Sequence, residues 1–169
     1  MDPLGELLAA GHHQTLEFFV AGLRDVSGPT VDHEELLYNA SVLAHYAQVS
    51  RGADDDLPAP ADLGEVFDHF VSDTALQWDT QMLEIAGAQC LLLTGFFETQ
   101  MRGRYNIRWY VGLGAGYFKR AALQEKTEKK ARLLGTIGAH FGFWRERHAR
   151  LSHELRADSA AMRRVRLVG

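Results

Sequence analysis

The longest apolar run of the chain spans Met82 to Phe97, and the other predicted elements are arranged around it. Its 16 residues, MLEIAGAQCLLLTGFF, include Glu84 as the only charged side chain. A helix that crosses a bilayer needs about 20 apolar residues, because each residue adds about 1.5 Å of length. The run is too short for this. A helix that is apolar on more than one face is typical of the interior of a bundle. We therefore expect this segment to be enclosed on all sides by the other helices.

Outside this run, apolar residues recur every three or four positions, which is the spacing of one helix face. No segment alternates as a strand does. The proline and aspartate residues of 52–60 indicate an exposed connection, and the basic residues 161–169 are expected to form a loose C-terminal arm. These patterns predict a single-domain, all-α bundle of five to six helices. The predicted helices cover residues 3–25, 32–51, 62–71, about 74–101 (the central helix), 107–123 and 126–153.

Local signals support several of these boundaries. Gly28-Pro29 ends the first helix, because proline lacks a backbone donor and disfavours helix in the residue before it. Asp32, followed three residues later by Glu35, resembles a capping box. Gly95 lies inside the central helix, where we expect it to bend the helix or to let a neighbour approach closely.

Three glycines occupy alternate positions in the predicted helix 107–123. Gly112, Gly114 and Gly116 each cost about 1 kcal/mol relative to alanine in a helix interior. We therefore expect that close packing or a bend requires small residues there.

Charge is divided unevenly along the chain, although the net charge is only −4. Residues 1–98 hold two bases and 17 acids, a net charge of −15, whereas residues 99–169 hold 16 bases and five acids, a net charge of +11. Such a division can mark a nucleic-acid or membrane surface on the basic half. It can also mean that acidic helices lie beside basic ones, within one chain or across a homodimer. The second interpretation is favoured, since charge runs usually form compensating faces.

Cys90 is the only cysteine, which excludes an intrachain disulfide and a thiolate metal cluster. This usage fits a reducing, cytoplasmic environment. The N-terminus carries no positively charged region before its short apolar run, unlike a secretory signal. Because Cys90 lies within the apolar run, we expect a small hydrophobic residue and not a nucleophile.

Known catalytic and cofactor motifs are missing from the sequence. There is no G-x-S-x-G elbow and no phosphate-binding P-loop, and the GLGAG of residues 112–116 lacks the spacing of a dinucleotide fingerprint. We therefore predict no cofactor, and the sequence favours binding over catalysis.

A metal-dependent enzyme is the first alternative, because the chain has eight histidines and many acids. Di-iron bundles use Glu-x-x-His pairs, and none occurs here. The pairs His13 with Glu17 and Glu65 with His69 are spaced four residues apart, so each pair would share a helix face. These four residues are the candidate ligands.

Polar residues on helices that we expect to be buried are the candidate ligand-pocket residues. They are Asn39, His45, Gln89 and Thr94. Buried polar groups need hydrogen-bond partners. These residues either bond one another, the backbone and water, or converge on a cavity between helices, where bundles place their ligands.

Nucleic-acid binding is the second alternative, carried by the segment RGRYNIRWY of residues 102–110. Arg102, Arg104 and Arg108 alternate there with aromatic residues, a combination that tracks phosphates and stacks on bases. The basic tail of residues 163–169 fits a nucleic-acid arm, a membrane-surface helix or a partner-docking segment. No recognised nucleic-acid-binding module accompanies these residues.

The succession AGAQCLLLTGFFETQM and RWYVGLGAGYFKRAA, within residues 80–122, resembles a group of uncharacterised all-helical bacterial proteins. In that group an apolar LFxTGxxPE-type helix precedes a YxxxGxxxY-type helix. Tyr110, Gly114 and Phe118 supply the second pattern here. Ala88 stands where an acidic residue is expected, and no proline precedes Glu98. The resemblance implies a helical fold and no particular activity.

Taken together, these patterns predict a soluble, cytoplasmic helical bundle that binds a small ligand or a protein partner without catalysis. A homodimer is expected from the division of charge and from the number of aromatic residues. No membrane span is predicted.

Overall fold

The computed structural model describes residues 12–51 and 80–168, and within these ranges every regular element is a helix. The predicted all-α class is therefore confirmed. None of the described helices is both long enough and apolar enough to cross a bilayer. The predicted connection 52–60 and helix 62–71 lie outside the described residues. In chain order the elements are α2 (His12–Ser27), α3 (His33–Arg51), α5 (Thr80–Leu91), the π-helical turn η1 (Leu92–Phe96), α6 (Glu98–Met101), α7 (Ile107–Gln124), α8 (Glu128–Ala139) and α9 (Phe141–Val168).

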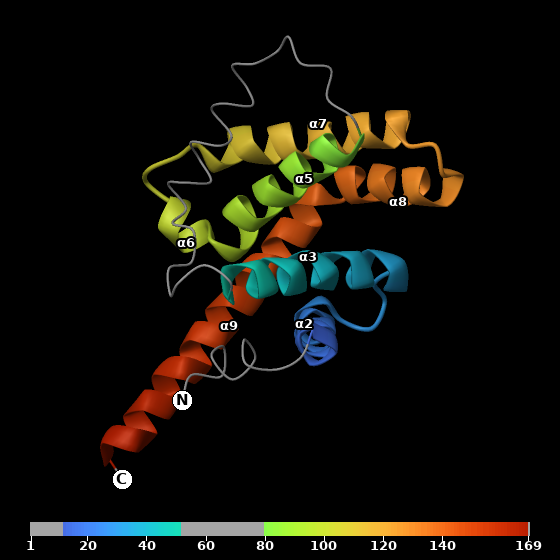
Figure 1. Ribbon diagram of the computed structural model, residues 1–169. Coiled ribbons are helices and arrows are strands. Elements are labelled where there is room, and N and C mark those ends of the chain that lie inside the picture. Colours follow the sequence, from blue (N-terminus) through green and yellow to red (C-terminus); the bar gives the residue numbers. More distant parts are fainter. Residues whose placement is uncertain (1–11, 52–79, 169) are drawn as a thin grey trace.

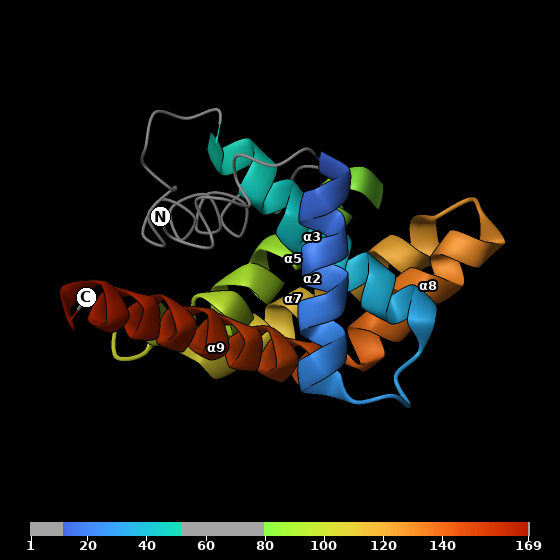
Figure 2. The same cartoon turned by 90° about the horizontal axis from the view of Figure 1, so that it is seen from below.

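The described helices form two groups that α9 holds together (Figures 1 and 2). In one group α7 packs between α5 and α8, and in the other α2 packs on α3. α9 crosses both groups, contacting η1 and α2. Its backbone remains helical to Val168. Residues 161–168, expected as an arm, therefore belong to the last turns of a helix.

The boundary between α2 and α3 follows the local signals of the sequence. Gly28 has a positive φ of 85°, the left-handed conformation that commonly ends a helix. Asp32 Oδ1 accepts a hydrogen bond from the backbone N–H of Glu35 at 3.0 Å, as expected of a cap. The carboxylate of Glu35 does not return to Asp32. It bonds His140 and Trp144 instead, so only half of a capping box forms.

The predicted continuous helix 74–101 is interrupted, and this is a correction to the sequence analysis. α5 ends at Leu91, one π-helical turn follows, and the short helix α6 begins after Phe97. The backbone N–H of Phe97 donates to the carbonyl of Leu92, five residues earlier, at 2.9 Å. A bond of this span widens the helix locally and redirects the chain.

The π turn occurs where α9 packs against the central segment. A Cβ atom on Gly95 would lie 2.7 Å from Cβ of His148 and 2.8 Å from the carbonyl oxygen of Arg145. Only glycine leaves room for this approach, which confirms the expected bend or close neighbour. The widened turn also leaves the carbonyl of Thr94 to accept from Arg145 Nε at 3.0 Å. Arg145 Nη2 lies 3.4 Å from Glu98 Oε2, so this arginine fixes both sides of the turn.

The enclosure expected for the central segment holds for only part of its length. Every residue from Cys90 to Gly95 is buried. Within α5, however, Ile85 is 47% exposed, and Ala88 and Gln89 are partly exposed. The expectation of enclosure on all sides is therefore wrong for one side of α5, because no described helix packs closely there.

The predicted helix 126–153 is divided into two helices, which is a second correction. α8 ends at Ala139 and α9 begins at Phe141. His140, between them, has φ −101° and ψ 20°, outside the helical range. The break turns Phe141 into the core, where its ring would lie 2.6 Å from a Cβ atom on Gly114. Close packing thus explains one of the three alternate glycines.

Acidic and basic helices lie side by side within the chain, which confirms the favoured interpretation of the charge division. Exposed ion pairs stabilise a fold little, so their value here is mainly to align the helices. Pairs between the two halves join Lys129 Nζ to Glu34 Oε1 at 3.7 Å, Lys130 Nζ to Glu84 Oε2 at 3.1 Å and Arg145 Nη2 to Glu98 Oε2 at 3.4 Å.

The contact at Gly95 predicts the effect of adding one methyl group. We expect Gly95→Ala to lower the free energy of unfolding by about 1–3 kcal/mol, because the new Cβ would collide with the α9 backbone. Gly112→Ala is the matched control, since nothing lies within 4 Å of its added Cβ. The control should be neutral or stabilise the fold by up to about 1 kcal/mol. Urea denaturation measures both, and equal effects would contradict this packing.

Candidate functional site

A groove with a volume of about 810 Å³ lies between α3 and α5, and the start of α8 borders one end. Each of the two helices contributes one face, because its lining residues recur every three or four positions. Most of the lining surface is apolar. The central lining residues are Tyr38, Val42 and His45 on α3 and Ile85, Ala88 and Gln89 on α5.

Polar side chains close the end of the groove near α8. The hydroxyl of Tyr38 donates to Glu84 Oε1 at 2.9 Å, and Lys130 Nζ lies 3.1 Å from Glu84 Oε2. Burial, followed by the charge of Glu84 and this hydrogen bond, raises the pKa of Tyr38 far above its ordinary value. The phenol therefore keeps its proton and remains a donor. Both oxygens of Glu84 are engaged, which ties α3, α5 and α8 together.

Gln89 supplies a polar atom that the described residues leave unsatisfied. Its Oε1 is buried and has no hydrogen-bond partner among them. Leaving a buried acceptor unsatisfied costs about 1–3 kcal/mol. Gln89 and the exposed His45 are the two predicted ligand-pocket residues that border the groove. Because Gln89 also lines the groove, this unsatisfied acceptor belongs to a side chain that borders the space for a bound molecule.

The other two predicted pocket residues lie inside the core and are not among the residues that line the groove. Asn39 Nδ2 donates to the carbonyl of Glu35 at 2.8 Å, and Asn39 Oδ1 lies 2.9 Å from His148 Nε2. The hydroxyl of Thr94 donates to the carbonyl of Cys90 at 2.7 Å. Both side chains are fully buried. For these two residues the structure therefore shows the first of the two alternatives, in which buried polar groups bond one another and the backbone.

The bond between Asn39 and His148 fixes the tautomer of the histidine. Because Asn39 Nδ2 donates to the backbone, its Oδ1 must accept from His148 Nε2. Nε2 therefore carries the proton, and Nδ1, which is buried without a partner, carries the lone pair. Burial lowers the pKa of His148 to about 3. The imidazole is thus neutral, since a second proton on Nδ1 would find no acceptor.

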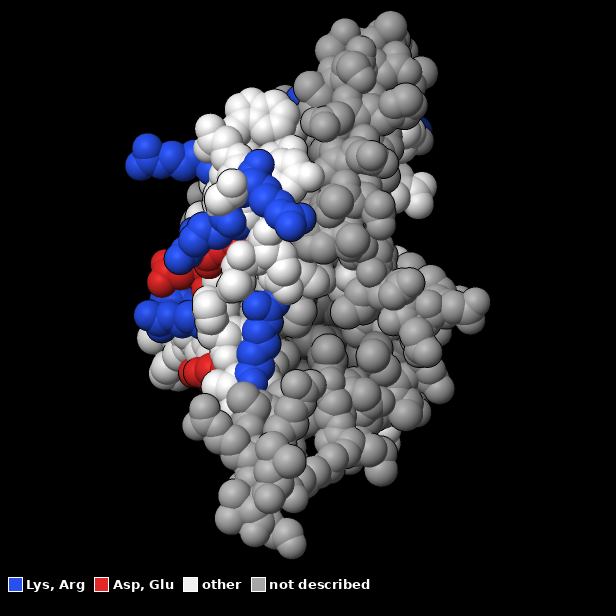
Figure 3. Space-filling model, turned by 90° about the vertical axis from the view of Figure 1, so that its left-hand side faces the viewer, with Lys and Arg blue, Asp and Glu red and all other residues white. Residues whose placement is uncertain are grey.

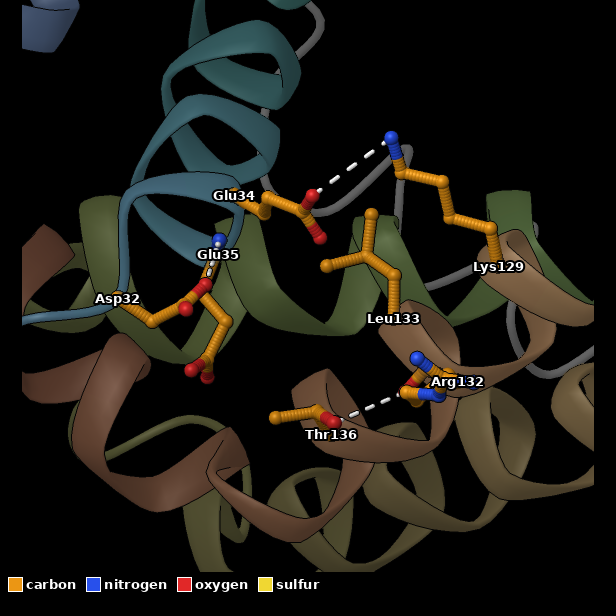
Figure 4. A pocket seen from close by; sticks show the side chains of 7 residues that line it. All are labelled: Asp32, Glu34, Glu35, Lys129, Arg132, Leu133 and Thr136. Carbon is orange, nitrogen blue, oxygen red and sulfur yellow. Dashed lines mark hydrogen bonds and ion pairs between the residues drawn. The ribbon is translucent and has the colours of Figure 1, made fainter.

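A second, more polar pocket of about 380 Å³ lies between the start of α3 and α8 (Figure 4). It holds charges of both signs. Lys129 Nζ lies 3.7 Å from Glu34 Oε1, and Arg132 Nη2 lies 3.3 Å from Glu128 Oε1. Because each base already has an acidic neighbour, this pocket presents no uncompensated charge of one sign to a ligand.

Glu35 borders the same pocket, but its carboxylate serves the fold. The side chain is only 9% exposed, and in Figure 4 it points away from Lys129. Its Oε1 accepts from His140 Nδ1 at 2.7 Å and from Trp144 Nε1 at 3.1 Å. This one oxygen joins α3 to the junction of α8 and α9. The sequence analysis assigned Glu35 a capping role, because partners more than 100 residues away leave no local signal.

The predicted metal ligands are not brought together by the described residues. His13 Nε2 lies 3.0 Å from Glu17 Oε1, and both side chains are exposed. Glu65 and His69 lie outside the described ranges. Within those ranges, no three His, Cys, Asp or Glu side chains are grouped as metal ligands. The metal hypothesis therefore stays a prediction without geometric support.

Cys90 is buried in the core, in keeping with its place in the apolar run. Burial raises the pKa of its thiol well above the ordinary value. Because the thiolate is the reactive form of cysteine, this environment disfavours nucleophilic chemistry at Cys90.

The three arginines predicted to contact nucleic acid lie in the turn before α7 and in its first turn. Arg102, Arg104 and Arg108 are all exposed. Arg102 pairs with Glu98, one helical turn earlier. Figure 3 looks onto this end of the molecule and shows Lys and Arg side chains gathered over its described part. Their exposure makes these arginines accessible to a partner, and the nucleic-acid hypothesis stays a prediction.

No family model, curated protein or solved structure matches this chain. The resemblance of residues 80–122 to a helical bacterial family therefore stays a prediction. Function has to be argued from the groove and its chemistry alone.

Several groove residues were missed by the sequence analysis. Tyr38 was not singled out there, and Ile85 was placed in the apolar run that we expected the other helices to enclose. A local signal could have indicated that Ile85 is exposed. Ile85 lies next to the charged Glu84, on the side of α5 opposite Gly87. A charged neighbour marks the side of an apolar helix that reaches solvent.

Burial of neutral His148 predicts a loss of stability in acid. The ordinary pKa of 6.5 applies when the chain is unfolded, whereas the folded pKa is about 3. Between these values the unfolded state binds the proton and the folded state does not, so stability falls as pH decreases from about 6.5 to 3. This residue adds at most about 1.4 kcal/mol per pH unit to the slope.

Urea denaturation across this pH range measures the slope. We expect it to be smaller in His148→Gln, whose side-chain amide can still donate to Asn39. If that variant does not fold, the ring signals of His148 in nuclear magnetic resonance spectra of the unaltered protein decide the matter. They should not titrate down to about pH 4, and titration near pH 6.5 would contradict the burial.

Proposed function

We propose that this protein binds a small, mostly apolar molecule with a hydrogen-bond donor in the groove between α3 and α5. The observation that carries the proposal is the combination of a largely apolar groove with the unpartnered buried acceptor Gln89 Oε1. The volume of about 810 Å³ lies within the range of roughly 300–1,000 Å³ typical of small-molecule sites.

The apolar wall supplies affinity and the polar atom supplies orientation. Val42, Ile85 and Ala88 line the groove, and covering them removes apolar surface from water. A donor on the ligand would satisfy Gln89 Oε1 and remove the cost of leaving that atom unsatisfied. An apolar body with one N–H or O–H group fits both requirements.

Binding is favoured over catalysis because the polar groups at the closed end already bond one another. Tyr38 and Lys130 both hold Glu84, so its carboxylate is not free to act as a base. His45 is exposed where it lines the groove, and no acid of the described residues forms a hydrogen bond with it. General-base catalysis needs a base that a second group orients. The described lining residues therefore fit a binding site better than a catalytic site.

N-phenyl-1-naphthylamine is a suitable probe, because it is neutral and apolar and has one N–H group. Its fluorescence should rise on addition to the protein. Ala88→Trp fills the groove and should weaken probe binding at least about tenfold, whereas Ala21→Trp, on an exposed position of α2, should not. Gln89→Leu should weaken binding severalfold, since the N–H group then has no acceptor.

Thermal unfolding of each variant checks that the fold is retained. The proposal fails if the probe does not bind to the unaltered protein. It also fails if Ala88→Trp and Ala21→Trp reduce binding equally, since the dye would then occupy another surface.

We also infer that two copies associate and that the chain works in the cytoplasm, as predicted from the sequence. The number of aromatic residues supports the first inference and the single cysteine the second. Light scattering over a range of concentrations tests self-association. A mass near twice the 18.9 kDa of one chain is expected, and a constant single-chain mass would contradict the homodimer.

A further inference from the structure

The outward side of α7 is left uncovered by the described helices. Its buried residues, Tyr110, Gly114, Tyr117, Phe118 and Ala121, lie on the side that packs against α5 and α8. Two large apolar residues lie elsewhere on the helix and are exposed: Trp109 at 45% and Leu123 at 86%. Single exposed apolar residues are common on protein surfaces, so it is their alignment and the charge around them that indicate a contact here.

Trp109 and Leu123 belong to one stripe of α7. They are 14 positions apart, which corresponds to nearly four helical turns, so the two side chains point the same way about 21 Å apart. Gly112 and Gly116 lie between them on the same side. A Cβ atom on either glycine would meet nothing within 4 Å. The stripe is therefore flat between two projecting apolar residues, a shape that suits contact with an extended surface.

Positive charge surrounds this stripe. Residues 99–124 contain five Lys and Arg residues and no Asp or Glu. Arg104, Arg108, Lys119 and Arg120 are exposed, and none of them forms an ion pair with an acid in the described part of the chain. The bases on α8 and α9 differ, because several have acidic neighbours. With no acidic partner among the described residues, these exposed cations can attract an external anionic partner.

We propose that this face of α7 binds the surface of an anionic lipid bilayer. Trp109 and Leu123 enter the boundary between headgroups and acyl chains, where Trp and Leu are favoured. Arg104, Arg108 and Lys119 pair with lipid phosphates in the same plane. The helix lies along the membrane without crossing it. Membrane binding by α7 does not depend on a ligand in the groove between α3 and α5.

A lipid surface fits these residues better than nucleic acid or a second copy of the chain does. Nucleic acid would use the arginines and stack on Trp109, but it would leave the apolar Leu123 in water. A second copy packed face to face would bring the same cations together and be repelled. Only the lipid surface uses both the apolar ends of the stripe and its charge.

Flotation with vesicles tests the proposal on the full chain. Vesicles of phosphatidylglycerol and phosphatidylcholine should carry the protein, whereas pure phosphatidylcholine should carry at least about tenfold less. Added salt should release the protein from the anionic vesicles. The double variant Trp109→Ser, Leu123→Ser and the double variant Arg104→Gln, Arg108→Gln should each lower the bound fraction about tenfold.

Leu37→Ser is the matched control, because Leu37 is a 40% exposed apolar residue on α3. It should bind vesicles as the unaltered protein does, and circular dichroism should show all variants folded. Absence of binding to anionic vesicles at low salt overturns the proposal. So does unchanged binding by both double variants. Binding to a short DNA duplex that is stronger than binding to vesicles would assign the face to nucleic acid and also overturn it.

Discussion

The packing of α9 on the central segment is the contact on which the rest of the structure depends. At Gly95 the two backbones meet with no side chain between them. The central helix yields by opening into a π turn, and the carbonyl of Thr94 is satisfied by Arg145 from the other helix. Because a π turn redirects a helix, this contact sets the direction in which α5 leaves the core. The position of α5 in turn determines one wall of the groove.

The other wall depends on a series of buried polar bonds along one half of α3. Glu35 and Asn39 bond residues at the start of α9, and Tyr38 bonds Glu84 on α5. A buried polar group is costly unless it is paired, so these bonds specify one arrangement more strictly than apolar packing does. They anchor the first half of α3. The groove borders α3 from Tyr38 to Tyr46, where space remains between α3 and α5.

Sequence patterns predicted the helices well where one local rule was sufficient. The start of α3 at Asp32 and the end of α2 at Gly28 follow from capping and from glycine conformation. The π turn and the break at His140 did not follow, because both depend on neighbours distant in the chain. Gly95 was recognised as a place of close approach, yet the identity of the neighbour, His148, has no local signal.

The same limit applies to the candidate site. Of the polar residues predicted on apolar helices, Gln89 and His45 border the groove. Asn39 and Thr94 belong to that class but bond within the core. Periodicity shows that two residues share a helix, but only the positions of the neighbouring helices decide whether a residue faces a cavity or a partner.

The small residues of α5 explain how the groove and the α7 face remain separate. Gly87 contacts Phe118 so closely that a Cβ atom would lie 2.9 Å from its ring, and a Cβ atom on Gly114 would lie 2.6 Å from Cβ of Cys90. Small residues thus let α5 and α7 pack as one layer. Ile85 projects from the opposite side of α5 into the groove, and Trp109 projects from the uncovered side of α7. A molecule in the groove and a membrane at α7 would contact opposite sides of this layer, so each surface can be altered without changing the atoms of the other.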